Sequence, residues 1–279
     1  MDKGKVWFIT GASKGIGLAL VKKLIENGGK VAATSRKYQT LIDAVGDYDQ
    51  LQFLPLELDL TSQESINNAF ERTVLHFGKI DVLVNNAGYG IGGAVEELTT
   101  EEIDASFEIN VMAVIKTMKS VMPYLRQQKS GNIINISSIE GFAAGVRRAV
   151  YAATKYSVMG LSEVMAEDVR EFGVNVTVVA PGAFRTNFLE DGSIVFGKNK
   201  IEGYNGIRAL DQRYAAMNGT QIGNPDKLAE IFIDIANFLN PPVRLFLGSD
   251  SYHRATEKIS LMSEELECHK NISFSTDFN

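Results

Sequence analysis

The chain has 279 residues, of which 45% are hydrophobic and 22% are charged, a composition typical of a globular protein with a large core. Its net charge of −6 disfavours a nucleic-acid-binding or anionic-membrane-binding role. One cysteine, Cys268, excludes an intrachain disulfide and fits a reducing cytoplasm. No apolar run approaches the ~18 residues that a membrane-spanning helix needs. Three widely separated histidines predict no metal site.

The N-terminal segment predicts a dinucleotide-binding unit. Residues 6–10 form a short apolar run that stops at glycine, as a buried parallel strand does. A glycine-rich loop over 11–17 follows, then a helical pattern that ends at Asn27, and then a second strand over 30–34. This order is typical of a βαβ unit that binds a dinucleotide. The N-terminus enters the first strand directly instead of offering a signal peptide, so we expect a cytoplasmic protein.

The loop glycines have separate physical roles. Gly11 permits the tight turn, Gly15 lets the backbone approach a pyrophosphate, and Gly17 allows the helix to pack closely on the sheet. The free N–H groups and the dipole at the helix start hold the phosphate charge. A glycine loop alone is a weak signal, because many such turns carry glycine for geometry only. The predicted cofactor contacts of this loop are Gly11, Ser13, Lys14, Gly15, Ile16 and Gly17.

The end of the second strand predicts which dinucleotide binds. An enzyme that uses NAD usually has a carboxylate there to hold the ribose 2′-hydroxyl. This chain has Arg36 instead, which could pair with a 2′-phosphate, and Lys14 adds a second cation nearby. NADP(H) is therefore favoured over NAD(H). The alternative is that Arg36 and Lys37 only form a solvated turn.

Polar turns follow two further predicted strands. After the strand over 51–58, Asp59 could accept a hydrogen bond from the adenine amino group or only cap the next turn. After the strand over 80–84, a small turn can lie against the cofactor, with Asn86 tying neighbouring strands. The residues assigned to the cofactor here are Asp59, Leu60, Asn86, Ala87 and Gly88.

Tyr151 and Lys155 are candidate catalytic residues. They are i,i+4 neighbours on a predicted helix, so their side chains emerge on one face. A phenol holds its proton until pH ~10, and a neighbouring ammonium is expected to lower that pKa and make an acid–base pair. Ser138 follows the strand over 131–136, at the edge where open α/β sheets bind ligands. The Tyr-x-x-x-Lys pattern alone occurs by chance on many helices, so the neighbouring motifs carry the prediction.

The remaining segments give weaker signals. Asn110 lies among apolar residues of a long helix that we expect to be interrupted at Pro123, and its amide either holds a buried kink, serves catalysis, or both. Residues 187–223 lack clear periodicity and predict an irregular substrate lid. A strand over 174–180 precedes this segment. A last strand over 243–247 and a C-terminal extension over 249–279 follow it, with a helix over 251–267 and a frayed tail from 271.

Taken together, Thr10-Gly-x-x-x-Gly-x-Gly17, Asn85-Asn-Ala-Gly88, Asn110, Ser138, Tyr151-x-x-x-Lys155 and Pro181-Gly182 closely resemble the short-chain dehydrogenase/reductase family in its compact single-domain branch. The resemblance is strong from Lys5 to Thr186. It implies one α/β Rossmann-type domain over 1–279, with a doubly wound, seven-stranded parallel sheet and helices on both faces. It also implies an oxidoreductase that transfers hydride between NADP(H) and a carbonyl or secondary alcohol.

The resemblance assigns a role to each motif. Tyr151 would exchange a proton with the substrate oxygen, and Ser138 would polarise that oxygen. Lys155 would bind the nicotinamide ribose and lower the tyrosine pKa, and Asn110 would hold a water. Ser137 is expected to be structural. The cofactor contacts implied after the sixth strand, where Thr186 would touch the carboxamide, are Pro181, Gly182, Phe184 and Thr186.

Substrate, assembly and subfamily are less closely specified. The expected pocket walls are apolar and favour a hydrophobic substrate, although Glu140 adjoins the site. The region after Gly182 looks more like retinol and 17β-hydroxysteroid dehydrogenases, and we expect a homodimer or homotetramer. Alternatives are a non-catalytic NADP(H)-sensing protein, a 3-oxoacyl-type reductase, or an epimerase or dehydratase of the longer branch. The expected walls are Tyr89 to Gly93, Ile139 to Phe142, Ala183, Phe184, Phe188, Leu189 and Phe196.

Overall fold

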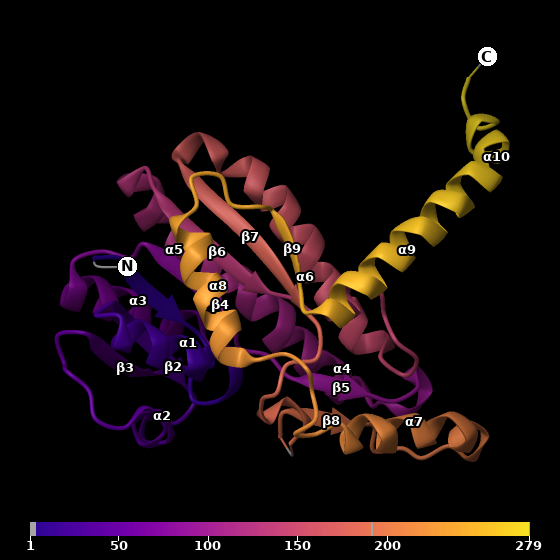
Figure 1. Ribbon diagram of the computed structural model, residues 1–279, viewed down its shortest axis with the longest axis horizontal. Coiled ribbons are helices and arrows are strands. Elements are labelled where there is room, and N and C mark those ends of the chain that lie inside the picture. The colour runs from indigo at the N-terminus through magenta and orange to yellow at the C-terminus, as the bar shows by residue number, and fades with distance from the viewer. Residues whose placement is uncertain (1–3, 191, 279) are drawn as a thin grey trace.

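A seven-stranded parallel sheet forms the centre of the protein in the computed structural model, which describes residues 4–190 and 192–278 (Figure 1). The strand order is β3-β2-β1-β4-β6-β7-β9, and all seven strands expected from the sequence are present. These strands are β1 (Val6–Ile9), β2 (Lys30–Ser35), β3 (Phe53–Glu57), β4 (Val82–Asn85), β6 (Gly131–Ile136), β7 (Val174–Pro181) and β9 (Arg244–Leu247).

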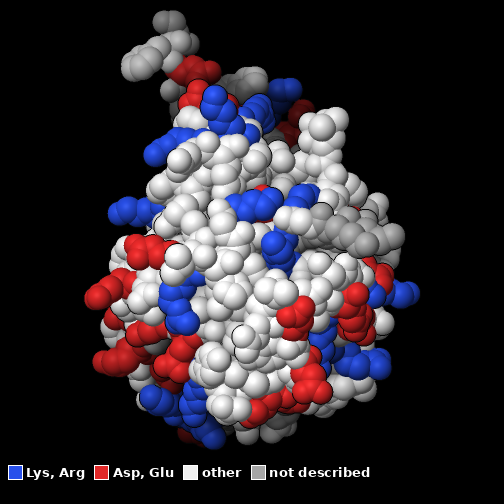
Figure 2. Space-filling model, turned by 90° about the vertical axis from the view of Figure 1, so that its left-hand side faces the viewer, with Lys and Arg blue, Asp and Glu red and all other residues white. Residues whose placement is uncertain are grey.

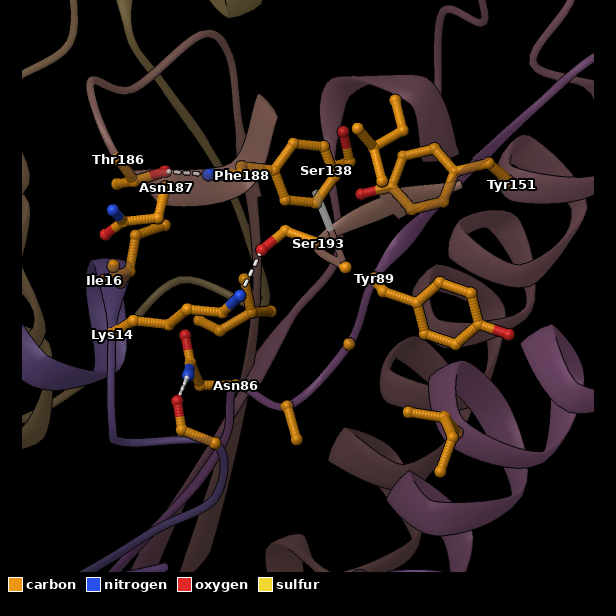
Figure 3. A pocket seen from close by; sticks show the side chains of 18 of the residues that line it. Lys14, Ile16, Asn86, Tyr89, Ser138, Tyr151, Thr186, Asn187, Phe188 and Ser193 are labelled. Atoms are coloured by element: carbon orange, nitrogen blue, oxygen red, sulfur yellow. Dashed lines mark hydrogen bonds between the residues drawn. The ribbon is translucent and has the colours of Figure 1, made fainter. Parts of the chain in front are cut away.

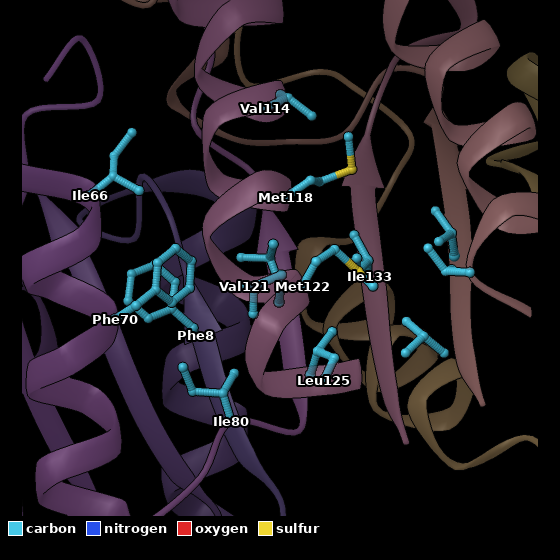
Figure 4. Close-up of a cluster of buried hydrophobic side chains, with 14 of the residues drawn as sticks. Phe8, Ile66, Phe70, Ile80, Val114, Met118, Val121, Met122, Leu125 and Ile133 are labelled. Atoms are coloured by element: carbon cyan, nitrogen blue, oxygen red, sulfur yellow. The ribbon is translucent and has the colours of Figure 1, made fainter. Parts of the chain in front are cut away.

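Helices cover both faces of this sheet and enclose two apolar cores. Side chains of a strand alternate between the faces, so Phe8 points into one core while Trp7 and Ile9 point into the other. Phe8 stacks on Phe70 with ring centroids 4.2 Å apart (Figure 4). One face carries α1 (Gly15–Glu26), α2 (Tyr38–Val45) and α8 (Pro225–Asn237), and the other carries α3 (Gln63–Phe77), α5 (Ala113–Gln128) and α6 (Ala149–Asp168).

The helix that contains Asn110 differs from expectation. It runs from α4 (Thr100–Phe107) through a π-helical turn over 108–112 into α5, and it continues past Pro123. The expected interruption at Pro123 is therefore wrong. A proline inside a helix costs ~3 kcal/mol, because it removes one backbone hydrogen bond and its ring clashes with the preceding turn. The free energy gained by burying Val121, Met122 and Leu125 against the sheet is larger. The irregular turn lies at Asn110 instead.

Two other expectations about irregular segments are wrong. The segment 187–223 is not structureless, because it contains a short strand and a helix. The strand pairs in parallel with residues 90–92 to form a second, two-stranded sheet. The C-terminal tail is also helical as far as Phe274, and only residues 275–278 of the described tail lack a helix, as expected. The elements concerned are β5 (Gly90–Gly92), β8 (Ile194–Phe196), α7 (Asn205–Ala216), α9 (Ser249–Cys268) and α10 (Lys270–Phe274).

Over the described residues, the charges on the surface in Figure 2 and the polarity of the helices give no sign of a nucleic-acid interface or a membrane-spanning segment. Acidic and basic side chains are interspersed over the face that Figure 2 shows. Among the helices within residues 4–190 and 192–278, none has the length and apolar character required to cross a bilayer. The short loops after the strands place polar turns at one edge of the sheet, and the candidate site lies there.

Candidate active site

One cavity of about 1130 Å³ lies at the carboxyl ends of the central strands. It extends from the glycine loop to the segment 187–223. Of the predicted site residues, only Gly17 and Asn110 are outside its lining. The predicted residues that line it are Gly11, Ser13, Lys14, Gly15, Ile16, Arg36, Asp59, Leu60, Asn86, Ala87, Gly88, Ser138, Tyr151, Lys155, Pro181, Gly182, Phe184 and Thr186.

The glycine loop has the geometry that its sequence predicts. Gly11 and Gly15 have φ angles of 65° and 59°, in the left-handed region that favours glycine. A Cβ atom on Gly17 would lie 2.5 Å from the Nδ2 atom of Asn86, so only glycine allows helix α1 to approach the neighbouring turn this closely. The first N–H groups of α1 are thereby presented to the cavity, as an anion-binding helix start requires.

The turn after β4 is locked to the glycine loop by hydrogen bonds. Asn86 Nδ2 donates to the carbonyl oxygens of Thr10 and Gly11, both at 2.9 Å. Thr10 Oγ1 accepts from the backbone N–H groups of Asn86 and Ala87, both at 3.0 Å. Asn86 therefore ties two neighbouring strands, as expected, and fixes the floor of the cavity.

The two candidate phosphate-binding cations have different surroundings. The side chain of Lys14 donates to Ser193 Oγ, so it links the glycine loop to the segment 187–223 (Figure 3). Arg36 is exposed at the end of β2, and it has no hydrogen bond or ion pair within the described part of the chain. Asp59 caps its own turn by accepting from the backbone N–H and the hydroxyl of Thr61, at 2.9 and 2.7 Å.

Ser138, Tyr151 and Lys155 meet at the inner end of the cavity. Tyr151 and Lys155 are only 6% and 5% exposed, and the hydroxyl of Tyr151 is directed towards Ser138 and Phe188 (Figure 3). The Lys155 ammonium lies 5.8 Å from the centroid of the Tyr151 ring and donates to the carbonyl oxygen of Ile136 at 2.9 Å. The sequence therefore identified a group of side chains that do converge.

The pKa values of Tyr151 and Lys155 differ from the expectation. Burial raises the pKa of the Tyr151 phenol above its ordinary value, and the hydrogen bond with Ser138 only partly opposes this. Burial also lowers the pKa of Lys155 to about 8. The expected net lowering of the tyrosine pKa is thus wrong for the protein by itself, because loss of hydration on burial outweighs the opposing effects of the Ser138 hydrogen bond and the positive charge of Arg148.

Ser137 and Asn110 have structural partners. Ser137 Oγ donates to the carbonyl oxygen of Lys155 at 2.8 Å, which agrees with the expected structural role. Asn110 is fully buried, and its amide bonds both the N–H and the carbonyl oxygen of Tyr89 at 3.0 Å. It also donates towards Thr154 Oγ1 at 3.3 Å. Asn110 thus holds the irregular helical turn against the Tyr151 helix, and a catalytic role stays a prediction.

The segment after β7 is held by the start of α9. The carboxylate of Asp250 accepts from the N–H of Ala183 at 2.7 Å, and the N–H of Gly182 donates to the carbonyl oxygen of Leu247 at 2.8 Å. Thr186 faces the glycine loop, since a Cβ atom on Gly15 would lie 3.5 Å from Thr186 Cβ. These bonds hold the predicted nicotinamide side of the cavity.

The cavity walls agree only in part with the expected walls. Tyr89, Ala183, Phe184, Phe188, Leu189 and Phe196 line the cavity, but the rest of the stretch from Tyr89 to Gly93 does not. The segment 139–142 does not line it either, because Phe142 packs edge-on against Phe246, with ring centroids 5.0 Å apart. Glu140 is paired with Arg254 of α9 at 2.9 Å.

A buried ionic cluster that the sequence did not reveal holds the larger part of the expected lid segment, residues 192–223. From here on we call these residues the lid. Arg147 pairs with Glu97 and Asp211, both at 2.8 Å, and Glu97 also pairs with Arg208 of α7. These hydrogen bonds, above all the one from Arg208, lower the pKa of the Glu97 carboxyl to about 2. The guanidinium carbon of Arg148 lies 4.2 Å from the ring centroid of Tyr214. Since Arg147 and Arg148 immediately precede α6, the cluster joins the lid to the Tyr151 helix.

Several further lining residues were not identified from the sequence. They come from the ends of the strands, from α4 and the π-helical turn after it, and from the segment 187–223; the most unusual is Gln221, which is 4% exposed. Within the described residues, neither its amide nitrogen nor its amide oxygen has a hydrogen-bond partner. A buried polar group without a partner is costly, and no local sequence pattern signals it. The further lining residues are Thr34, Ser35, Leu58, Thr61, Glu101, Glu102, Ala105, Ile109, Ile136, Ser137, Asn187, Gly192, Ser193, Ile194, Val195, Lys198, Tyr214 and Met217.

Comparison with known proteins shows the family to which this chain belongs. A sequence profile described as short chain dehydrogenase matches residues 5–193. The chain belongs to the short-chain dehydrogenase family. It is therefore an oxidoreductase of the class that interconverts CH–OH and C=O groups.

Two curated relatives of this short-chain dehydrogenase cover most of its length. It is 34% identical over 273 residues to oxidoreductase BOA17 of Botryotinia fuckeliana (strain B05.10), covering 98% of this chain and 99% of that protein. It is 36% identical over 247 residues to 3-ketodihydrosphingosine reductase of Bacteroides thetaiotaomicron, covering 88% of each chain.

Solved structures share the fold. A short-chain dehydrogenase from Streptomyces avermitilis is 32% identical with a TM-score of 0.87, covering 98% of this chain and 100% of that chain. The structure of ElxO with NADP bound is 25% identical with a TM-score of 0.72, covering 87% of this chain and 96% of that chain.

Proposed function

We propose that this short-chain dehydrogenase is a cytoplasmic, NADP(H)-dependent reductase that acts on the carbonyl group of a hydrophobic substrate. The observation that carries the proposal is the continuity of the large cavity, which joins the glycine loop and Arg36 to Ser138, Tyr151 and Lys155. A dinucleotide fits these residues because the loop glycines open the start of α1 towards the cavity. The bound nicotinamide would supply the hydride.

NADP(H) is favoured over NAD(H) by the charge at the end of β2. Arg36 lines the cavity, is exposed, and has no partner among the residues that the structure describes, so its guanidinium is free to pair with a 2′-phosphate. Lys14 lies across the glycine loop and adds positive charge to the same cavity. The NADP bound in the structural neighbour ElxO supports this choice.

Tyr151 is proposed as the acid and base. Because burial raises the pKa of its phenol, the side chain keeps its proton at neutral pH and is ready to donate it to a carbonyl oxygen. Ser138 lies where its hydroxyl can bind the same oxygen as negative charge develops on it. Lys155 is positioned below them to bind ribose hydroxyls. A protonated phenol is the form that reduction of a carbonyl requires.

The substrate side of the cavity is mostly apolar. Phe188 lies opposite the reacting hydroxyl, with its ring centroid 6.0 Å from that of Tyr151. Val195, Phe196 and Met217 of the lid extend this wall. Apolar walls with a few polar groups favour a hydrophobic ketone or aldehyde. The relative named 3-ketodihydrosphingosine reductase supports a ketone substrate.

Replacement of one phenol tests the proposal. NADPH consumption is followed with a panel of ketones, aldehydes and quinones of graded size, and Tyr151→Phe is expected to lower turnover at least ~100-fold while NADPH still binds. Tyr156→Phe is the matched control, because Tyr156 lies on the same helix but is 43% exposed and hydrogen-bonds the carbonyl of Phe142. Undiminished turnover of Tyr151→Phe would exclude the proposed acid–base role.

A further inference from the structure

Tyr214 of the lid brings a second phenol to the catalytic cavity. It lies on α7 one turn after Asp211, which pairs with the buried Arg147 at 2.8 Å, so this ion pair fixes the face of α7 that carries Tyr214. Tyr214 lines the same cavity as Ser138 and Tyr151. The pKa of the Tyr151 phenol is raised first by burial and next by Tyr214, which makes the two phenols electrostatic neighbours.

The ring of Tyr214 has a partner, but its hydroxyl has none. The guanidinium carbon of Arg148 lies 4.2 Å from the ring centroid, in a cation–π contact, and Arg148 itself is only 7% exposed. Within residues 4–190 and 192–278, the hydroxyl of Tyr214 forms no hydrogen bond. A phenylalanine would pack on Arg148 in the same way. The hydroxyl is therefore the part of this side chain that the fold leaves free for a ligand.

This hydroxyl is a hydrogen-bond donor at neutral pH. Burial raises the pKa of the Tyr214 phenol above its ordinary value, so the phenol keeps its proton. Under the proposed function, Tyr151 and Ser138 both bind the carbonyl oxygen that is reduced. Tyr214 is then available to a different atom of the same substrate, and buried phenols usually find such a partner.

The charges around Tyr214 favour a neutral partner over a carboxylate. Besides burial, two guanidinium groups act on its pKa, those of Arg148 and Arg254, and each already faces a carboxylate. Arg254 pairs with Glu140 at 2.9 Å, and Arg148 lies 4.0 Å from Asp211. A hydroxyl or carbonyl oxygen can accept a hydrogen bond from the Tyr214 phenol without the help of a further cation.

We propose that Tyr214 determines substrate specificity by donating a hydrogen bond to a second oxygen of the substrate, near the carbonyl that is reduced. This inference rests on the proposed function and narrows its substrate class to hydrophobic ketones that carry a neighbouring hydroxyl or second carbonyl. A site built to hydrogen-bond a substrate oxygen discriminates against the analogue that lacks it, because the protein group is then left unpaired.

Ligand binding to the protein loaded with NADP⁺ tests this role without requiring turnover. Isothermal titration calorimetry compares hexyl methyl ketone with its analogue that carries a hydroxyl on the methyl carbon. The wild type is expected to bind the hydroxyketone ~10-fold more tightly, because the substrate hydroxyl pairs with a phenol that otherwise has no partner. Tyr214→Phe should remove most of this preference while changing the affinity for the plain ketone less than ~3-fold.

Tyr204→Phe is the matched control. Tyr204 also belongs to the lid, but its hydroxyl bonds Glu96 at 3.0 Å and it does not line the cavity, so its substitution should leave the preference unchanged. Because Tyr214→Phe keeps the ring on Arg148 and removes only a hydroxyl without a partner, loss of folding does not confuse the result. A wild type without the preference, or a Tyr214→Phe protein that keeps it or loses both affinities equally, contradicts the role of Tyr214.

NADPH oxidation with the same two ketones keeps this inference separate from the proposed function. The expected result is a ~10-fold higher kcat/KM for the hydroxyketone, which Tyr214→Phe abolishes. A wild type that reduces neither ketone contradicts the proposed reductase activity on such ketones, whereas the calorimetric ratio still decides the role of Tyr214. Reduction of both ketones with the same kcat/KM ratio in the wild type and in Tyr214→Phe contradicts the role of Tyr214 and leaves the reductase proposal intact.

Discussion

Lys155 donates a hydrogen bond to the carbonyl oxygen of Ile136 at 2.9 Å, from a side chain that is only 5% exposed. This bond holds the ammonium below the Tyr151 ring but replaces little of the water that the charge has lost. The result is a pKa of about 8 for Lys155, against an ordinary value of 10.5. The proposed ribose-binding group is therefore kept in place at a cost to stability.

The first prediction concerns this cost. Between pH about 8 and 10.5 the unfolded chain holds a proton at Lys155 that the folded protein has released, so stability rises with pH in this window. Lys155→Met removes the buried charge and is expected to raise the free energy of unfolding at pH 7 by up to about 3 kcal/mol while abolishing turnover.

Urea denaturation at pH 7 and at pH 9.5 measures this effect. The stability advantage of Lys155→Met over the wild type should shrink at the higher pH, where the wild-type lysine is already neutral. Lys119→Met, at an exposed position of α5, is the control and should show no such change. An advantage that is the same at both pH values would contradict the assigned lysine pKa.

The second prediction concerns cofactor choice. Arg36→Ala is expected to weaken NADPH binding ~10–100-fold, because a charge-assisted pair with the 2′-phosphate is lost, and to leave NADH binding nearly unchanged. Fluorescence titration with both cofactors gives the two affinities. Lys37→Ala is the matched control, because Lys37 is the next residue but does not line the cavity. Equal losses for NADPH and NADH would rule out the 2′-phosphate role of Arg36.

The third prediction concerns the ionic cluster that holds the lid. The pKa of Glu97 is lowered to about 2 from an ordinary 4.5, so its contribution is complete above pH 4.5 and is lost as the pH falls towards 2. Glu97→Gln leaves Arg147 and Arg208 without their shared carboxylate and is expected to destabilise the lid by about 3 kcal/mol at pH 7.

Limited proteolysis between residues 192 and 223 reports on this lid. Glu97→Gln should be cleaved much faster than the wild type at pH 7, and the difference should vanish as the pH falls from 4.5 towards 2. Glu71→Gln, at an exposed position of α3, should behave like the wild type. If cleavage of the lid is no faster in Glu97→Gln, the cluster does not hold it.

The strands and the polar turns could be predicted because their signals are local. An apolar run that ends in glycine, asparagine or serine identifies both a strand and the sheet edge where Asn86 and Ser138 lie. The i,i+4 spacing of the Tyr-x-x-x-Lys pattern predicted the convergence of Tyr151 and Lys155. It gave the wrong direction for the tyrosine pKa, because burial depends on the whole fold and not on the i,i+4 spacing.

The lid could not be predicted for a related reason. Helix α7 packs through Arg208, Asp211 and Tyr214, so the face that it turns to the protein is polar and gives no apolar periodicity. Its ionic partners Glu97 and Arg147 are far away in the sequence. Only the folded chain brings these charges together.

The last prediction concerns Gln221, the buried lining residue whose amide has no partner in the described residues. Such an amide costs stability unless a ligand completes its hydrogen bonds. Gln221→Leu is therefore expected to raise the free energy of unfolding by about 1–2 kcal/mol and to weaken binding of cofactor or substrate ~10-fold. Urea denaturation, NADPH titration and KM for the best carbonyl substrate separate the three effects. Gln212→Leu, at an exposed position of α7, should change none of them, and a Gln221→Leu protein that gains stability with unchanged binding would contradict the ligand role.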